Sequence, residues 1–291
     1  MANFKGTKMN SPEEKSRYGG ASGPVAYETL IETDADGLRI ESTTIESRGT
    51  EMPVYVARPA NSKEVPVVLV ICEAFGLNEH IKDITRRFGH QGYLAIAPDL
   101  MIRQGDALSF DKIDDLLRHL LLRIPDAQVM ADLDACVEWA SRAGGDTTRL
   151  AATGFCWGGR WTWLFAAHRA FSAAVAWYGV LDGRVNNLFP ADVTRFPSHP
   201  LERARDLKTP VLGLYAERDA AIPLQTVEHM SRGLADGSAA ARASYIKVYP
   251  NVGHAFFADY RQSFDREAAT DGWERCLGWI ARGFGEPART T

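Results

Sequence analysis

The chain has 291 residues, of which 45% are hydrophobic and 24% are charged, and its formal net charge is −4. This length and balance fit one large globular α/β domain, or two small ones, with a sizeable buried core. The slight negative charge, without any basic stripe, argues against nucleic-acid binding, and no apolar stretch approaches the length of a membrane span.

The first 25 residues are polar and rich in Gly, Ser and Lys, and we expect a flexible tail over 1–25. Extended segments over 37–45 and 52–57, joined by the turn Arg48-Gly49-Thr50, predict a β-hairpin.

From residue 65 onward the pattern changes to short apolar runs, which are typical of strands buried on both faces. The predicted strands cover residues 65–72, 93–97, 150–153, 173–178, 211–215 and 245–249. The amphipathic stretches between them predict helices over residues 81–91, 110–122, 127–143, 159–169, 224–235 and 267–284. Strands alternating with helices indicate an α/β fold with a doubly wound, mostly parallel sheet. We expect a single domain over 26–285 and a C-terminal tail over 286–291.

The segment 181–209 is long, weakly periodic and rich in proline. A loop of this length inside a compact domain is usually a lid or a binding loop, so we expect it near the active site.

The most informative motif is Gly154-Phe155-Cys156-Trp157-Gly158-Gly159, which follows a predicted strand and opens a predicted helix. In a nucleophile elbow the reactive residue occupies a sharp turn between strand and helix, and glycines flank it where side chains would collide. Here a cysteine has the place that serine commonly takes. Its sulfur would lie at a helix N-terminus, where unpaired N–H groups and the helix dipole favour a thiolate.

A histidine and two carboxylates follow other predicted strands. His254 lies in a short, glycine-marked loop after the last strand, a position that none of the other six histidines shares. Glu217 and Asp219 follow the strand 211–215, and we favour Asp219, which lies further from the strand end. The alternatives are that Asp219 only caps the next helix and that Asp99, after a different strand, supplies the acid.

The order Cys156, Asp219, His254 is that of the α/β-hydrolase fold. A triad requires His254 within hydrogen-bond reach of the sulfur and an aspartate that fixes the imidazole tautomer. The backbone N–H groups of Trp157 and Ala74 would then form the oxyanion hole.

Taken together, these stretches resemble the dienelactone hydrolase family, the carboxymethylenebutenolidases. The matching stretches are Glu73-Ala-Phe-Gly-Leu-Asn, Ala97-Pro-Asp-Leu-Met-Ile-Arg-Gln, Gly154-Phe-Cys-Trp-Gly-Gly, Trp177-Tyr-Gly, Glu217-Arg-Asp and Gly253-His-Ala-Phe-Phe, within residues 38–283.

The resemblance implies further site residues. Glu73 would lie against the thiol in the resting enzyme, and Arg103 would contact a substrate carboxylate. Tyr178, Phe75 and Phe256 would line the substrate site.

One position departs from the family pattern. Dienelactone-cleaving members carry a second carboxylate-binding arginine four residues after the histidine, where this chain has Ala258. Arg261 or an arginine of 181–209 could replace it. The departure, the N-terminal tail and the long loop all indicate a divergent substrate.

Glu73 also has a structural alternative, a buried ion pair with Arg86 or Arg103. Cys72 could form a redox pair with Cys156, but a buried thiol at a strand end is the favoured interpretation.

A cysteine nucleophile narrows the substrates, because a thiolate leaves a tetrahedral intermediate more readily than an alkoxide does. We therefore expect activity on activated esters and enol lactones, weak activity on alkyl esters and none on amides. A thioesterase or general carboxylesterase, and a non-catalytic ligand sensor, are the alternatives.

We expect no cofactor and no metal. The four cysteines are far apart without zinc-ligand spacing, and no G-x-G-x-x-G or Walker motif occurs. Together with the lack of an apolar signal core, this cysteine usage favours a cytoplasmic location. The oligomeric state is not predicted.

Overall fold

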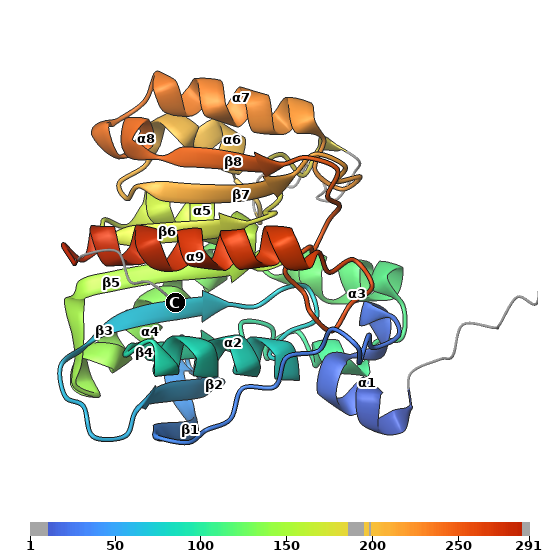
Figure 1. The fold of residues 1–291 in the computed structure, drawn as a ribbon, viewed down its shortest axis with the longest axis vertical. Helices are drawn as coiled ribbons and strands as arrows, with labels where there is room; N and C mark the ends of the chain where they lie inside the picture. The colour runs from blue at the N-terminus through green and yellow to red at the C-terminus, as the bar shows by residue number, and fades with distance from the viewer. Residues whose placement is uncertain (1–10, 186–194, 198, 287–291) are drawn as a thin grey trace, which may run out of the picture.

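One eight-stranded sheet forms the centre of the molecule in the computed structural model, which describes residues 11–185, 195–197 and 199–286 (Figure 1). The strands are β1 (Leu38–Ser47), β2 (Thr50–Pro59), β3 (Val65–Ile71), β4 (Leu94–Pro98), β5 (Gly145–Phe155), β6 (Ala173–Trp177), β7 (Val211–Ala216) and β8 (Tyr245–Tyr249). Their order in the sheet is β1-β2-β4-β3-β5-β6-β7-β8. The predicted α/β fold with a mostly parallel sheet is confirmed.

The antiparallel part of the sheet is the N-terminal hairpin. β1 pairs with β2, and β2 pairs antiparallel with β4. Arg48 and Gly49 connect the hairpin strands with φ angles of 51° and 77°. Two-residue turns with positive φ at both positions match the right-handed twist of a hairpin.

The remaining neighbours, from β4 through β3, β5, β6 and β7 to β8, pair in parallel. All seven residues of β3 are buried, which explains its unbroken apolar sequence. The parallel strands therefore end at one edge of the sheet, which Figure 1 shows on the right, where α1 and α3 also lie.

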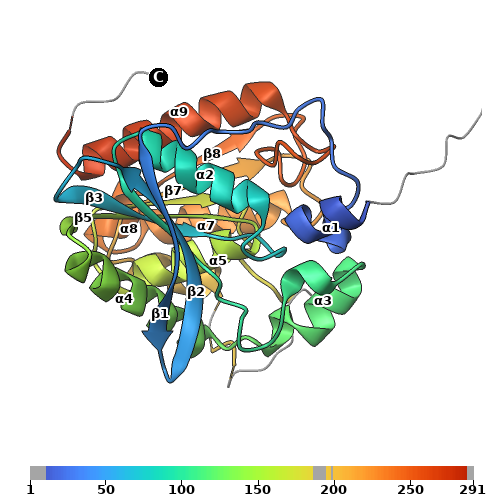
Figure 2. The same cartoon turned by 90° about the horizontal axis from the view of Figure 1, so that it is seen from below.

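Helices cover both faces of the sheet. They are α1 (Pro12–Tyr18), α2 (Glu79–His90), α3 (Ile113–His119), α4 (Asp126–Arg142), α5 (Trp157–His168), α6 (Pro200–Arg203), α7 (Leu224–Ala235), α8 (Ala239–Ala243) and α9 (Arg266–Gly283). α2 and α9 pack on one face, and α4 and α5 pack on the other (Figures 1 and 2). In the described residues, no helix is long and apolar enough to cross a membrane.

The expected flexible tail over 1–25 is wrong for residues 11–25. A capping box formed by Ser11 and Glu14 begins α1. Tyr18 is 2% exposed and stacks on Tyr260, with ring centroids 5.0 Å apart. A buried aromatic contact thus fixes a segment whose polar composition suggested a tail. Residues 1–10 lie outside the described part.

The expectation for 181–209 also changes. Part of this segment folds as α6, followed by a 3-10 turn over Ala204–Asp206, and α6 packs on α5 and α7. Residues 186–194 and 198 lie outside the described part. At the other end of the chain, Glu286 pairs with Arg149 at 3.1 Å, and residues 287–291 are not described.

Candidate active site

The turn between β5 and α5 carries Cys156 in a sharp, left-handed backbone conformation, with φ 53° and ψ −110°. A Cβ on Gly154 would come within 2.4 Å of the Gly158 carbonyl oxygen. A Cβ on Gly158 would come within 2.4 Å of the Ile71 carbonyl oxygen at the end of β3. The flanking glycines therefore permit the close approach that an elbow requires.

The structure brings Cys156, Asp219 and His254 together at the carboxyl edge of the sheet. His254 Nε2 lies 3.2 Å from the Cys156 sulfur, and His254 Nδ1 lies 2.6 Å from Asp219 Oδ2. The three residues follow β5, β7 and β8 respectively. Their geometry is that of a nucleophile, a base and an orienting acid.

Local hydrogen bonds fix the orientation of Asp219. Its Oδ1 accepts the backbone N–H groups of Ala221 and Ile222 at 2.8 and 3.0 Å, which leaves Oδ2 for the imidazole. Glu217 is exposed and accepts the Asn251 backbone N–H at 2.8 Å, so it does not compete for the imidazole. α7 begins after Pro223 without a side-chain cap, so Asp219 is not simply its N-cap.

Opposing effects act on His254. Burial alone would lower the pKa of its imidazole, but the adjacent Cys156 sulfur and the Asp219 carboxylate raise the pKa to about 10. The site therefore favours a protonated imidazole between the Cys156 sulfur and the Asp219 carboxylate.

A cavity of about 260 Å³ opens beside the sulfur. Its lining is mostly apolar, with His254 and Arg261 as the basic side chains. The lining residues are Ala21, Ala74, Phe75, Ile113, Leu117, Leu121, Cys156, Trp157, Val180, Ala221, His254 and Arg261. None of the described residues of 181–209 lines it, so the loop expected at the active site does not contact the cavity through that part.

Both residues expected to form the oxyanion hole line this cavity. Ala74 follows β3, and Trp157 is the first residue of α5. The close approach of Gly158 to the end of β3 brings these two backbone segments together.

Glu73 is 1% exposed and lies beside the site, but its partners differ from the expected ones. Its Oε1 accepts hydrogen bonds from the Tyr260 hydroxyl and, at 3.2 Å, from Asn78 Nδ2. Among the described residues, no hydrogen bond joins Glu73 to the Cys156 sulfur. The carboxylate therefore has partners that the sequence analysis did not name, and its place against the thiol stays a prediction.

The alternative of a structural ion pair for Glu73 fails. Arg86 binds Glu79 at 2.9 Å and Asp83 at 3.2 Å, on the outer side of α2. Tyr260 was missed by the sequence analysis, and its only sequence signal is its place six residues after His254.

Arg103 does not reach the cavity, so its expected role at a substrate carboxylate is wrong. Its guanidinium binds Asp132 at 2.7 and 3.0 Å and donates to Thr50 Oγ1 and to the Ser47 carbonyl oxygen at 3.1 and 2.5 Å. The Asp132 side chain is fully buried, and an unpaired carboxylate there would be costly because it has lost its water. The salt bridge with Arg103 offsets this cost.

Two expected substrate contacts instead support His254. Tyr178 is fully buried and meets the imidazole edge-on, with ring centroids 5.2 Å apart. Phe256 is also fully buried and packs on Tyr178 and Trp177. Of the expected aromatic contacts, Phe75 does line the cavity.

Arg261 is the cation of the cavity. Its guanidinium lies over the Phe75 ring, 5.3 Å from the centroid. Burial alone would lower its pKa, but the nearby Tyr260, Glu73 and Cys156 raise it, so the guanidinium stays charged. Among the described residues, no carboxylate forms a salt bridge with it.

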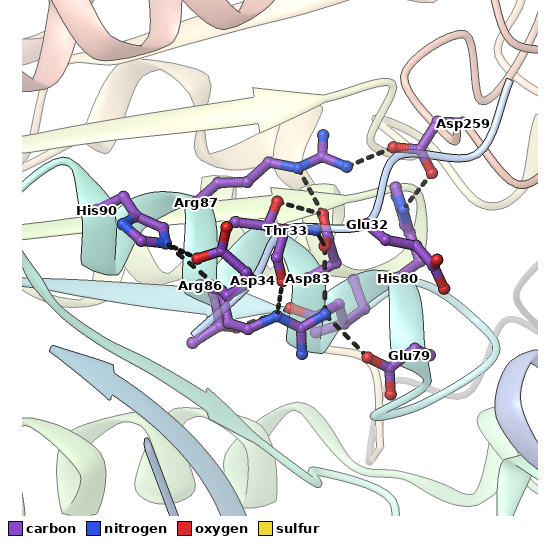
Figure 3. Close-up of polar contacts among 12 residues, drawn as sticks. Glu32, Thr33, Asp34, Glu79, His80, Asp83, Arg86, Arg87, His90 and Asp259 are labelled. Carbon is purple, nitrogen blue, oxygen red and sulfur yellow. Dashed lines mark hydrogen bonds and ion pairs between the residues drawn. The ribbon is translucent and has the colours of Figure 1, made fainter. Parts of the chain in front are cut away.

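A buried ion network anchors the loop that follows His254 (Figure 3). Asp259 lies 3.1 Å from His80 Nδ1 and also accepts a hydrogen bond from Arg87. Arg87 binds Asp83 at 2.6 Å, and Asp83 accepts the Thr33 backbone N–H at 2.6 Å. Burial alone would raise the pKa of Asp259, but His80 and Arg87 hold it below its usual range. The network ties this loop to α2 and to residue 33.

The chemistry-bearing residues do not suggest a metal centre. Within the described ranges, no group of three or more His, Cys, Asp or Glu side chains could hold a metal ion. Cys72 is fully buried, and burial raises the pKa of its thiol well above the ordinary value. It is a free cysteine, as Cys156 is, so the two do not form a disulfide.

Comparison with known proteins identifies the family of this chain. The model of the dienelactone hydrolase family matches residues 52–284. A protein of Salmonella typhi named "Putative carboxymethylenebutenolidase" is 48% identical over 92% of this chain and 96% of its own length. A Yersinia pestis protein of the same name is 50% identical over 84% of this chain and 89% of its own length.

The crystal structure titled "Putative Dienelactone Hydrolase" from Klebsiella pneumoniae subsp. pneumoniae is also similar. It shares 49% identity, covers 84% of this chain and 99% of its own, and superposes with a TM-score of 0.78. The chain therefore belongs to the dienelactone hydrolase family of ester-cleaving hydrolases.

Proposed function

We propose that the protein hydrolyses activated carboxylic esters or enol lactones through a thioester formed on Cys156. The observation that carries this proposal is the 3.2 Å contact of His254 Nε2 with the sulfur, with Asp219 2.6 Å behind the imidazole. The elbow presents the sulfur to a largely apolar cavity, where a neutral ester can bind.

The reaction has two halves. In the first, the thiolate attacks the ester carbonyl carbon, and the N–H groups of Trp157 and Ala74 stabilise the oxyanion. The intermediate collapses, the carbon–oxygen bond breaks, and His254 Nε2–H protonates the departing alkoxide or enolate. In the second half, His254 takes a proton from water, the hydroxide attacks the thioester, and the Cys156 thiolate leaves.

The leaving group limits the substrates. A thiolate is the better leaving group when its competitor is an alkoxide, so an alkyl ester mostly returns to the starting complex. An enolate or a phenolate is stabilised and departs in competition with the thiolate. The proposal therefore covers aryl esters and enol lactones, and a reducing compartment such as the cytoplasm keeps the nucleophile active.

We assign Glu73 a positioning role in the described state. Its carboxylate binds Tyr260 and Asn78, whereas the Cys156 sulfur contacts His254, so we assign the thiol proton to His254. Arg261 is the group we propose for a substrate carboxylate, because it is charged, lines the cavity and binds no described carboxylate. It would take the place of the family arginine that Ala258 replaces.

The test is the hydrolysis of p-nitrophenyl acetate by the wild type and by Cys156→Ala. We expect wild-type turnover, with a mass increase equal to one acetyl group on the wild-type chain after rapid quenching in acid. Cys156→Ala should lose both turnover and the adduct. A wild type without turnover, or a Cys156→Ala variant as active as the wild type, would refute the proposal.

A substrate panel separates the alternatives. Dienelactone and aryl esters should be hydrolysed well and an ethyl ester poorly, while an acyl-CoA, whose thiolate leaves as readily as Cys156, tests the thioesterase alternative. If the acyl-CoA has the highest kcat/KM, the protein is a thioesterase on the same scaffold, and rapid ethyl ester turnover would contradict the leaving-group reasoning.

A further inference from the structure

The N-terminal segment contributes to the wall of the active-site cavity. We define the N-terminal cover as residues 12–23, which contain α1 and a 3-10 turn over Gly20–Ser22. Ala21, within this cover, lines the same cavity as Cys156 and His254. A segment outside the α/β core thus lines the cavity into which the sulfur opens.

The cover is fixed on one side to the chain that precedes α3. The Ala21 backbone N–H donates to the Phe110 carbonyl oxygen at 2.8 Å, and Lys15 Nζ lies 2.7 Å from Asp111 Oδ1. Gly20 lies so close that a Cβ there would be 2.3 Å from Asp111 Oδ1 and 3.1 Å from its Cα. Figure 2 shows α1 and α3 side by side at this end of the molecule.

The other side of the cover is fixed to the loop that follows His254. Tyr18 stacks on Tyr260, whose hydroxyl donates to Glu73, and the Ala26 backbone N–H donates to the Tyr260 carbonyl oxygen at 2.8 Å. The cover therefore bridges the chain before α3 and the loop that follows His254, and contacts on both sides hold it in place.

α3 and the turn after it supply the facing apolar surface. Ile113, Leu117 and Leu121 line the cavity, and Ile113 is 41% exposed, which places it at the mouth. Among the described residues, the side chains that the cover, α3 and this turn contribute to the cavity are all apolar. This surface favours an apolar substrate group and offers no partner to a polar one.

The size of the cavity limits that group. A dry apolar cavity of about 150 Å³ is enough to bind benzene, and this cavity measures about 260 Å³. A substituted aromatic ring or an apolar chain of similar bulk fits, and a much larger group meets the cover.

We propose that the N-terminal cover is a specificity element that sets the largest apolar group of the ester, through Ala21. This inference deepens the proposed function and rests on it. The substrate class it implies is an ester whose acyl or alcohol part is a compact apolar group, about the size of a substituted aromatic ring.

Two variants of the cover test it from opposite directions. Ala21→Trp adds bulk to the wall of the cavity. Gly20→Val places a Cβ 3.1 Å from Asp111 Cα and from the Phe110 carbonyl oxygen, so the cover has to move away from this chain by a few tenths of an ångström. Ala35→Trp, an exposed position on the same N-terminal stretch, is the matched control for the added indole. Thermal unfolding shows that each variant is folded.

The measured quantity is the ratio of kcat/KM for a bulky ester to kcat/KM for the acetate. One series of p-nitrophenyl esters varies the acyl group from acetyl to phenylacetyl, and one series of aryl acetates varies the alcohol part. Ala21→Trp should lower the ratio by about tenfold or more in at least one series, whereas Ala35→Trp should leave it within about twofold. Gly20→Val should raise the same ratio, because the wall has moved outward.

A ratio unchanged in both series for both cover variants would overturn the inference. That result is distinct from failure of the proposed function, which Cys156→Ala and the wild-type acetate assay decide independently. An equal change in Ala35→Trp would also contradict it, since the indole would then act without reaching the cavity.

Discussion

Replacing Cys156 with alanine should change the titration of its neighbour, His254. Burial would lower the pKa of this imidazole, and the adjacent Cys156 sulfur and the Asp219 carboxylate raise it from 6.5 to about 10. The sulfur is the foremost of the favourable partners. Its removal should therefore bring the pKa of His254 down toward its ordinary value.

The size of the effect follows from the raised pKa. At about 1.36 kcal/mol per pH unit, the rise from 6.5 to about 10 corresponds to on the order of 5 kcal/mol in favour of the charged imidazole. Asp219 alone remains in the variant, and one nearby carboxylate supports a rise of about 1–3 pH units. The pKa should thus fall clearly below the wild-type value while staying above 6.5.

The assay is a nuclear magnetic resonance titration of the imidazole nitrogens, with His254→Asn identifying the resonance. The raised pKa of His254 also makes the free energy of unfolding depend on pH. Because the folded pKa is the higher one, the stabilisation by His254 is complete below pH 6.5 and is lost as the pH rises through about 10.

Identical titration near pH 6.5 in the wild type and in Cys156→Ala would refute this reasoning. It would mean that the sulfur does not raise the pKa of the imidazole in the resting protein. The nucleophile would then have to be activated only after the substrate binds.

The remaining predictions concern the surroundings of the triad. Tyr260→Phe keeps the ring but removes the donor to the buried Glu73 carboxylate, so urea denaturation should show a loss of about 1.5–3 kcal/mol; an unchanged midpoint would argue against that hydrogen bond. Gly158→Ala places a Cβ 2.4 Å from a β3 carbonyl oxygen and should lower kcat for p-nitrophenyl acetate at least about 10²-fold by displacing an oxyanion donor. The control Gly278→Ala meets no atom within 4 Å and should be fully active and slightly more stable. Arg261→Met should raise KM for carboxylated esters but not for neutral ones, and an equal effect on both classes would show that the guanidinium does not bind the carboxylate.

Much of the fold could be predicted because local patterns carry it. The seven apolar residues of β3 have only one stable environment, a strand covered on both faces. Arg48 and Gly49 form the tight turn that the hairpin pattern predicts. The periodicity of α7 gave its observed bounds, Leu224–Ala235.

The predicted ends of helices were less accurate where tertiary packing overrides the helical periodicity of the sequence. The stretch 110–122 was predicted as one helix, but the helix α3 ends at His119 and a 3-10 turn over Leu121–Arg123 follows. The short helices α6 and α8 were not predicted. Segments of four and five residues carry too few positions for a helical period to stand out.

Within the site, the sequence determined the elbow and the strand ends that carry Cys156, Asp219 and His254, because glycine spacing and strand order are written along the chain. The tertiary structure decided which long or buried polar side chains meet. Arg103 forms a salt bridge with the buried Asp132, and the Tyr260 hydroxyl donates to Glu73. Tyr18 stacks on Tyr260 and so fixes the N-terminal cover. These contacts join residues far apart in sequence, and each depends on which partner is left without water in the folded protein, a property that no local pattern contains.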